Sequence, residues 1–483
     1  MQYQRKAWVL VWRMLWRRAS KRAAAFAGVA CTAGVLWVAC KTTVMEKPPP
    51  DVQEEEGKKE KPPPPPLPPS PPKSLCEAHS ALAKKLGTEH LLIGIMTEAT
   101  PERYENAISD VPYGLKYIYL AEGAHAGGPL DACFQQADYS WWGCWNLKLG
   151  ETKSGARLRR LFESTETAGQ IPLVVYYTFY RTIGEGVLTN AMLANAGKVQ
   201  DYFDDWRFAL KTVNEYQQTS GKPVMIHIEP DLWGYAQQGQ EGRASPEHLR
   251  VEVRSTTRGD CSDMADNFAG FGQCMLHMAR KHAPQASIGL MASGWSTDVD
   301  INLTQPFLDM AGIVRSTSAY FENFRVGNDL GDFLVVEFTD RDAAYYDVRP
   351  AAEGGPEDRW QRRVESEHPN FPRTFAWAKA MAEALKLPLL WWQIPMGHQG
   401  LKNERTWVPD GQGGGEWASG EWKDDRVDYF FKEGGLEEVV KNHGIAVTFG
   451  PGRRDQTSPA TDGGYLKEEV EKAKRPGLVC TQP

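Results

Sequence analysis

Short apolar runs alternate with amphipathic stretches along most of the chain after residue 75. Eight runs are rich in β-branched and aromatic residues, which is typical of strands that are buried on both faces. They begin at Leu91, Leu115, Pro172, Pro223, Ser287, Phe333, Pro388 and Gly444. Apolar residues at helical spacing predict helices over residues 195–219, 262–282, 371–385 and 427–442.

Strands that alternate with helices over roughly 400 residues predict an α/β fold of the (β/α)8 TIM-barrel type, with long loops at the C-terminal face of the strands. A doubly wound open sheet is the alternative, but no GxGxxG or P-loop motif follows any of the runs. We therefore expect residues 75–483 to form a single barrel domain.

Residues 1–40 have the features of an export signal. They contain seven Lys or Arg and no acidic residue, and an apolar run ends in Val38, Ala39 and Cys40. The small residue before Cys40 resembles a bacterial lipobox, which implies lipidation of Cys40. Cleavage with secretion and an uncleaved membrane anchor are the alternatives. We expect an extracytoplasmic protein of the bacterial cell envelope, at the outer membrane or the cell surface.

Residues 41–74 predict a disordered spacer. They contain 12 of the 32 prolines and equal numbers of basic and acidic residues, so they favour extended polyproline II over a packed core. Beyond residue 40 the chain has 48 basic and 62 acidic side chains. This acidic balance argues against a nucleic-acid partner. It leaves the oligomeric state open.

Six cysteines follow the spacer, an even number that predicts three disulfides in an exported protein. Their positions favour the pairs Cys76–Cys480, Cys133–Cys144 and Cys261–Cys274. Buried free thiols are the alternative. No CxxC spacing or flanking His suggests a zinc or redox site, and we predict neither a metal nor a cofactor.

Carboxylates follow several runs, at the strand ends where a barrel has its active site. In HIEPDLWGY, alternation predicts that His227, Glu229 and Asp231 share one face. The sixth run places Glu337 at its end and Asp340 beyond it. Two carboxylates can cleave a glycosidic bond as acid and as base or nucleophile. We predict Glu229 as the acid, Glu337 or Asp340 as its partner and Asp231 as the residue that tunes them. An ion-pair network that caps the barrel is the alternative.

Tryptophan is abundant, and 13 of the 17 lie beyond residue 75. Aromatic rings suit the faces of sugar rings, although burial in the core is the alternative for each ring. A substrate-binding surface is predicted from Tyr177, Trp233, Trp295, Trp391 and Trp392, with Glu122, His227 and Gln393. Trp141 and Trp142, in the loop after the second run, are further candidates. Residues 411–422, rich in glycine, predict a lid or an irregular loop.

The Glu-Pro that ends the fourth run resembles the (β/α)8-barrel glycoside hydrolase superfamily. In the clan with Asn-Glu-Pro at this place the Glu is the acid, which implies that role for Glu229, while Ile228 replaces the Asn. The nucleophile of that clan, on strand seven, falls at Gln393. HIEPDL is also similar to glycoside hydrolase family 6, which has Glu-Pro-Asp at a strand end. No specific family is assigned.

Paired carboxylates and aromatic rings predict an exported, surface-tethered glycoside hydrolase that cleaves a polysaccharide or oligosaccharide. Its partners would be this carbohydrate and, through the N-terminus, a membrane. Esterase and metalloprotease chemistry is disfavoured, because GxSxG and HExxH motifs are missing. A non-catalytic barrel that binds a glycan or a protein is the alternative, and Gln393 favours it.

Overall fold

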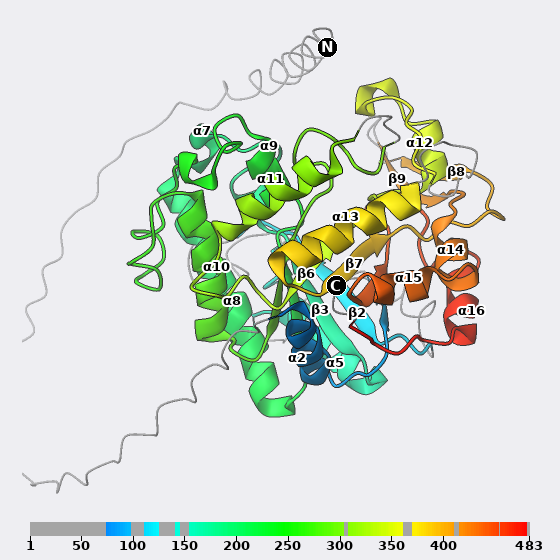
Figure 1. Ribbon diagram of the computed structural model, residues 1–483, viewed down its shortest axis with the longest axis horizontal. Coiled ribbons are helices and arrows are strands. Elements are labelled where there is room, and N and C mark those ends of the chain that lie inside the picture. The colour runs from blue at the N-terminus through cyan, green and yellow to red at the C-terminus, as the bar shows by residue number, and fades with distance from the viewer. Residues whose placement is uncertain are drawn as a thin grey trace, which may run out of the picture. The chain divides into compact units, whose positions relative to one another are not determined.

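The computed structural model describes residues 74–97, 111–124, 141–144, 154–303, 308–360, 370–409, 415–453 and 455–480 (Figure 1). Eight parallel strands close into a barrel in the order β1-β10-β7-β6-β5-β4-β3-β2. The predicted barrel is confirmed, and each predicted run contains one of its strands. These are β1 Leu92–Met96, β2 Leu115–Leu120, β3 Ile171–Tyr176, β4 Met225–Ile228, β5 Ser287–Met291, β6 Phe333–Val336, β7 Leu389–Ile394 and β10 Gly444–Phe449.

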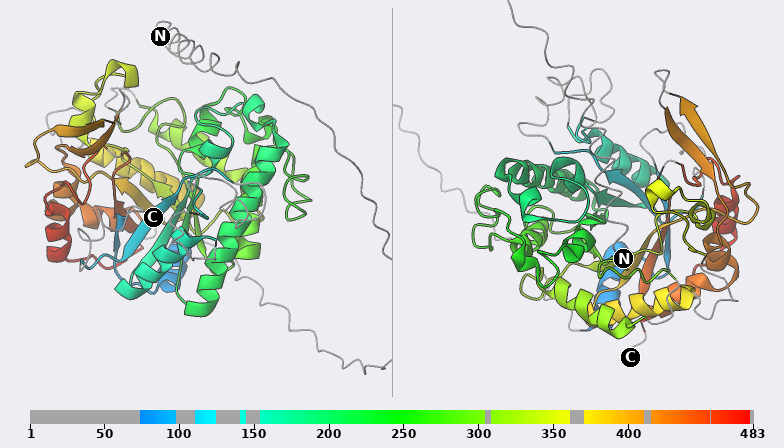
Figure 2. Two further views of the ribbon diagram at one scale, coloured as in Figure 1. Left: turned by 180° about the vertical axis from the view of Figure 1, so that it is seen from behind. Right: turned by 90° about the horizontal axis from the view of Figure 1, so that it is seen from above.

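Helices surround the barrel, so that the strands are buried on both faces and need continuous apolar sequences (Figures 1 and 2). The longer ones are α2 Leu75–Leu86, α5 Ala156–Ala168, α8 Ala196–Ser220, α10 Phe268–His282, α11 Met310–Glu322, α13 Asn370–Leu385 and α16 Tyr465–Lys472. The shorter ones are α6 Phe179–Thr182, α7 Asn190–Leu193, α9 Leu232–Gln238, α12 Ala343–Asp347, α14 Arg426–Lys432 and α15 Gly435–Lys441.

Two helices differ from their predicted bounds. The helix predicted from residue 262 begins at Phe268, because the Asn267 side chain caps it by accepting a hydrogen bond from the N–H of Gly270. The helix predicted over residues 427–442 is two helices, α14 and α15. Gly434, with a φ of 81°, separates them in a left-handed conformation that glycine adopts without strain.

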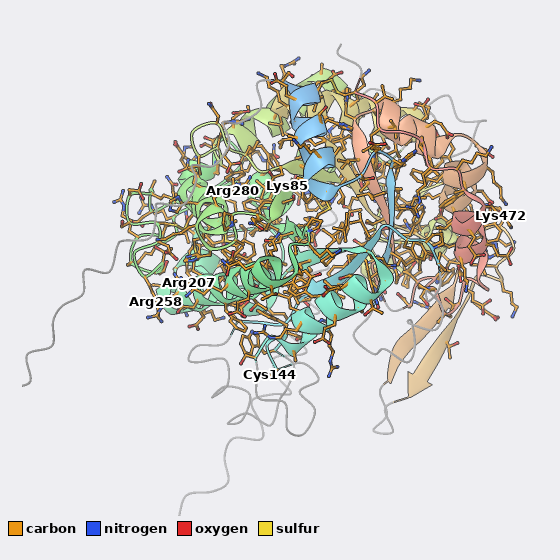
Figure 3. The ribbon with its side chains drawn as sticks, turned by 90° about the horizontal axis from the view of Figure 1, so that it is seen from below. Lys85, Cys144, Arg207, Arg258, Arg280 and Lys472 are labelled. Atoms are coloured by element: carbon orange, nitrogen blue, oxygen red, sulfur yellow. A yellow bond between two sulfur atoms is a disulfide. The ribbon has the colours of Figure 1, made fainter. Side chains whose placement is uncertain are left out.

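Helix α2 lies against the N-terminal ends of the barrel strands. Its Lys85 ammonium donates to the carbonyl of Ala286, just before β5, at 2.9 Å. Lys85 also lies 3.7 Å from Asp332, just before β6, and Arg280 of α10 pairs with the same carboxylate at 2.8 Å (Figure 3). These contacts fasten α2 to the face of the barrel opposite the strand ends that form the mouth.

Two of the three predicted disulfides are present among the described residues. Cys76 of α2 is bonded to Cys480, and Cys261 is bonded to Cys274 of α10. Cys144 is disulfide-bonded as well, but its predicted partner Cys133 lies outside the described residues. The Cys76–Cys480 bond joins the two ends of the barrel domain across 404 residues.

A two-stranded hairpin extends from the barrel after β7 (Figure 2). It consists of β8 Glu404–Pro409 and β9 Gly415–Glu421, so part of the predicted glycine-rich loop is a strand. Among the described residues no helix has the length and apolar character to cross a membrane. The predicted export signal and spacer, including Cys40, lie outside those residues.

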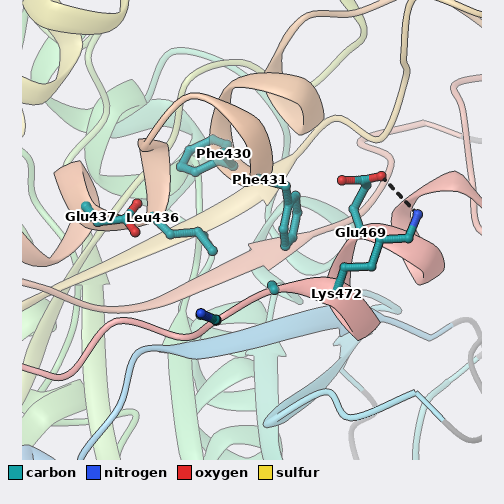
Figure 4. Close-up of a pocket in the computed structure, with 8 residues that line it drawn as sticks. Phe430, Phe431, Leu436, Glu437, Glu469 and Lys472 are labelled. Carbon is teal, nitrogen blue, oxygen red and sulfur yellow. Dashed lines mark ion pairs between the residues drawn. The ribbon is translucent and has the colours of Figure 1, made fainter.

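A small hollow lies between α14, α15 and α16, on the outer helical layer (Figure 4). Phe430, Phe431 and Leu436 form its apolar part, and Glu469 and Lys472 lie at its rim, 3.6 Å apart. None of the predicted site residues lines this hollow, so the site must be built from the strand ends.

Candidate active site

The backbone at the end of β4 differs from the predicted alternation. His227 points into the barrel and its ring lies 4.8 Å from the ring of Trp392. Burial lowers the pKa of His227 to about 3, so this imidazole is neutral. Glu229 then has a φ of 47°, a left-handed conformation that ends the extended strand. Alternation therefore no longer decides where the Glu229 side chain points.

The Glu229 carboxyl group is completely buried behind the strand ends. Its Oε1 accepts hydrogen bonds from the N–H groups of Thr178 and Phe179, at 3.1 and 3.0 Å, and from the hydroxyl of Tyr202 on α8, at 2.9 Å. Burial raises its pKa to about 8, and these hydrogen bonds oppose the shift. The predicted general acid is thus neutral at pH 7, but it has no surface that a substrate could reach.

Asp231 is the carboxylate of this segment that is open to solvent. It lies at the start of α9, is partly exposed and accepts a hydrogen bond from the hydroxyl of Tyr177 at 2.5 Å. Burial raises the pKa of Asp231 to about 6, Tyr177 lowers it, and the charges of Asp340 and Glu185 raise it. Asp231 is therefore largely ionised at pH 7.

Glu337 directly follows β6 and is 7% exposed. The indole N–H of Trp295 donates a long hydrogen bond, 3.4 Å, to its Oε1. Burial raises the pKa of Glu337 well above its usual value, and the nearby charges of Asp231 and Asp340 raise it further. The site therefore favours the protonated form of Glu337 far more than an exposed site would, and its neighbour Asp231 has the lower shift, to a pKa of about 6.

Asp340 lies in the loop after β6 and completes a group of three carboxylates with Asp231 and Glu337. The hydroxyl of Tyr346 donates to Asp340 at 2.6 Å, and the Nε of Arg341 lies 3.2 Å from its other oxygen. Burial raises the pKa of Tyr119 on β2, and the charges of all three carboxylates raise it as well. The three carboxylates thus converge above the barrel, within electrostatic reach of one buried phenol.

Two of the four predicted tryptophans lie at the mouth or inside the barrel. Trp295 is partly exposed, and its ring is tilted against that of Tyr235 on α9 with ring centres 5.1 Å apart. It packs so closely on Gly234 that a Cβ there would lie 2.6 Å from the indole. Trp392 points into the barrel, with its ring 5.8 Å from that of Tyr119. Trp295 is therefore the ring that is placed to meet a ligand beside Glu337.

Trp233 and Trp391 lie in the core instead of at the mouth. Trp233 packs against Phe268 and Phe324, and Trp391 stacks on Phe338 at 4.6 Å. Trp391 faces outward because neighbouring residues of a strand point to opposite faces, and its neighbour Trp392 points inward. The prediction that both rings contact substrate is corrected.

Trp141 and Trp142 are also buried. Both indole N–H groups donate to the carboxylate of Asp205 on α8, at 2.7 Å for Trp141 and at 3.0 and 3.1 Å for Trp142. The hydroxyl of Tyr176 donates to the same carboxylate at 2.9 Å. These two rings hold residues 141–144 against α8 and do not form a platform.

The remaining predicted residues lie around the mouth. Gln393 has a φ of 55° and is 5% exposed. Gly452 packs against it: a Cβ added to Gly452 would lie 2.6 Å from the amide nitrogen of Gln393 and 2.1 Å from the carbonyl oxygen of Asp340. Glu122 is partly exposed and lies close enough to Arg181 to raise the pKa of that guanidinium.

Several residues of the site were not predicted from the sequence. Tyr235 lies four residues after Asp231 on α9, a spacing that places both on one side of a helix once that helix is recognised. Tyr346, in the short helix α12, lies six residues after Asp340, so no helical spacing links the two in the sequence. Tyr202 has no such signal, because a tyrosine within a long amphipathic helix is expected in the core. No group of three or more His, Cys, Asp or Glu in the described ranges could hold a metal ion.

Comparison with known proteins does not assign a family. No family model and no curated protein sequence matches the chain. Among solved structures it is similar to a β-1,4-mannanase from Podospora anserina, with 8% identity, 84% of this chain and 66% of that chain covered and a TM-score of 0.41. A family 26 endo-β-1,4-mannanase from Cellulomonas fimi has 12% identity, coverages of 82% and 74% and a TM-score of 0.41. An endoglucanase from Mycobacterium tuberculosis has 10% identity, coverages of 52% and 59% and a TM-score of 0.25.

The chain thus spans just under two thirds of the Podospora enzyme. The structure establishes that the fold is a closed (β/α)8 barrel with carboxylates at its mouth. At such low sequence identities, the activity must be inferred from the site residues of this chain.

Proposed function

We propose that this protein is a glycoside hydrolase in which Glu337 is the proton donor and Asp231 is the nucleophile or the base. The observation that carries this proposal is the difference between two neighbouring carboxyl groups. Burial raises the pKa of Glu337 well above its usual value and so favours its protonated form, whereas Asp231, with the Tyr177 hydroxyl 2.5 Å away, has a pKa of about 6 and is largely ionised at pH 7. Such a pair is what acid-catalysed cleavage of a glycosidic bond requires.

The role of acid moves from Glu229 to Glu337 in this proposal. Burial raises the pKa of both carboxyl groups and favours their protonated forms, but only Glu337 has exposed surface at the mouth. The Trp295 indole beside Glu337 provides an apolar ring on which a sugar can stack, with its N–H directed to the carboxyl group. Asp340, held by Tyr346 and Arg341, is placed to accept hydrogen bonds from sugar hydroxyls.

In the proposed reaction Glu337 gives its proton to the glycosidic oxygen as the bond from that oxygen to the anomeric carbon breaks. Asp231 either forms a bond to the anomeric carbon, to be displaced later by water, or removes a proton from the water that attacks it. The first course retains the anomeric configuration and the second inverts it. The Tyr177 hydroxyl stabilises the negative charge of Asp231 before the reaction begins.

A screen of neutral and acidic polysaccharides tests the proposal. The purified protein is expected to release oligosaccharides from at least one of them, and NMR of the first product gives its anomeric configuration. The Asp231→Asn/Glu337→Gln double variant, with both carboxyl groups replaced by amides of the same shape, serves as the control and should release none.

A non-catalytic glycan-binding barrel is the second candidate, because Gln393 occupies the end of β7 where a carboxylate would be needed for the resembling clan. If the wild-type protein cleaves no glycan but several glycans change its tryptophan fluorescence, this candidate replaces the hydrolase.

We also propose that the protein acts outside the cytoplasm, attached to the envelope through Cys40. The two observed disulfides support an oxidising compartment. Cells grown with a fatty-acid analogue should incorporate the label into the wild-type protein, and Cys40→Ser should abolish it, because the thioether needs that sulfur. Label on the Cys40→Ser protein would contradict lipidation at this residue, and an unlabelled wild-type protein would favour secretion.

A further inference from the structure

Glu229 has an unusual position for a carboxyl group so close to the mouth. It lies two residues before Asp231, yet it is completely buried, and one of its oxygens, Oε1, receives all three of its hydrogen bonds. The other oxygen, Oε2, has no partner among the described residues. Burying a carboxyl group away from water costs free energy. The three groups that donate hydrogen bonds to Oε1 therefore indicate its role.

Two of the three donors are the backbone N–H groups that directly follow Tyr177. Strand β3 ends at Tyr176, and α6 begins at Phe179, so the N–H groups of Thr178 and Phe179 have no strand partner. Glu229 supplies their acceptor from the end of the neighbouring strand. The direction of the chain at Tyr177 is therefore fixed by the Glu229 carboxyl group.

The third donor connects Glu229 to a helix of the outer layer. Tyr202 of α8 donates to Oε1, and its ring packs edge-on against Phe179 with ring centres 5.5 Å apart. Tyr202 also contacts the ring of Phe271 on α10 at 5.5 Å. The carboxyl group is thus held between the turn after β3 and the outer helices, where it has little freedom to move.

Tyr177 extends this arrangement to the mouth. Its own N–H donates to the carbonyl of Leu120 on β2 at 2.9 Å, and its ring lies 4.7 Å from that of Tyr180. Its hydroxyl donates to Asp231 at 2.5 Å. A chain of contacts therefore runs from Glu229 through the backbone of Thr178 and Phe179 to Tyr177, and from its hydroxyl to the reacting carboxylate.

We propose that Glu229 is a positioning residue that holds the Tyr177 hydroxyl against Asp231 and thereby sets the orientation and charge of Asp231. The importance of Asp231 in this inference rests on the proposed function. The titratable carboxyl groups that face Asp231 are Asp340, Glu185 and Glu337, and the phenols near it are those of Tyr177, Tyr119 and Tyr235. Asp231 is itself the charged group that faces Glu229.

Glu229→Gln and Glu229→Met distinguish positioning from proton donation. In Gln the amide oxygen can accept the three hydrogen bonds of Oε1, and the amide nitrogen takes the place of the unpartnered Oε2, so kcat should stay within about threefold of the wild type. Met keeps the volume but removes the acceptor. We expect Glu229→Met to lower kcat by about 10- to 100-fold, because Tyr177 loses its alignment.

The pKa of Asp231 in the protein without substrate gives a second measurement. It can be followed by NMR of the carboxyl carbon of labelled Asp across a pH titration, with Asp231→Asn identifying the signal. Tyr177→Phe removes a hydrogen bond that favours the ionised form, so we expect a rise of about one pKa unit. Glu229→Met should give a similar rise, and the double variant should add little to either single change.

Each outcome decides between the alternatives. A loss of activity in Glu229→Gln as large as that of Glu337→Gln would make Glu229 a proton donor and overturn the inference. An unchanged Asp231 pKa in both Glu229→Met and Tyr177→Phe would also overturn it. If Glu229→Met does not fold, Tyr177→Phe and Glu229→Gln still test both steps. If no glycan is cleaved by the wild type, the proposed function fails while the NMR titration continues to test the contact chain.

Discussion

Glu337→Gln is expected to lower kcat on an unactivated glycan by about 10²- to 10⁴-fold. Gln keeps the shape and the contact with the Trp295 indole but has no proton to give to the leaving oxygen. The loss should be much smaller on aryl glycosides with a good leaving group, because their departure needs little protonation. Comparing kcat on the two kinds of substrate measures the contribution of the proton itself.

The pH dependence of kcat/KM also tests whether Glu337 is the proton donor. The protonated form of Glu337 is the active one, and burial raises its pKa well above the usual value. In the wild type, kcat/KM should therefore fall as the pH rises through the pKa of Glu337, and this alkaline limb should disappear in Glu337→Gln. Glu322→Gln on α11, where the carboxylate pairs with Arg325 at the surface, is a control for the same chemical change. Equal rates for Glu337→Gln and that control would exclude Glu337 as the acid.

Asp231→Asn is expected to lower kcat by at least about 10³-fold on every substrate, activated or not. Asn keeps an acceptor for the Tyr177 hydroxyl, but it can neither attack the anomeric carbon nor remove a proton from water. A loss that does not depend on the leaving group separates this role from that of Glu337. With Asp231→Ala, added azide should restore turnover and form a glycosyl azide, because the space left by the carboxylate admits a small anion.

The acid limb of the pH profile should belong to Asp231. Its ionised form is the active one and its pKa is about 6, so kcat/KM falls as the pH decreases through 6. This limb should be absent from the residual activity of Asp231→Asn. Asp298, in the loop after β5, has an exposed carboxylate that pairs with Arg243. Asp298→Asn is the matched control and should keep the wild-type pH profile. Should Asp231→Asn keep both the rate and the acid limb, Asp340 would become the candidate for its role.

The barrel could be predicted from the sequence because strands buried on both faces leave continuous apolar runs, and all eight runs contain a barrel strand. Helix ends were harder to predict, since a single cap decides them. Asn267 shortens α10, and Gly434 divides the last predicted helix. The bond between Cys76 and Cys480 followed from their positions near the two ends of the domain.

The candidate site could be predicted only in part. The sequence placed Asp231, Glu337 and Asp340 at strand ends, and the structure brings them together. It could not show that Glu229 adopts a positive φ, because that conformation accompanies hydrogen bonds between its carboxyl group and the turn after β3, about 50 residues earlier in the chain. Nor could it decide which of Trp391 and Trp392 faces the barrel interior, because a run that is apolar on both faces leaves the strand register undetermined.

The position of α2 has a mechanical consequence for a protein held by its N-terminus. Helix α2, the first described element, lies on the face of the barrel where Lys85 meets Asp332, opposite the ends of β4 and β6. If the protein is attached through its N-terminus as proposed, the attachment enters the barrel domain on the face opposite the mouth and leaves the strand ends unobstructed. Tension from a large bound polymer would enter α2 beside Cys76 and pass through the disulfide to the C-terminal segment, whose Leu478 N–H bonds the carbonyl of Glu89 ahead of β1. The force would then act on both ends of the barrel domain, so it would not separate β1 alone from the neighbouring strands.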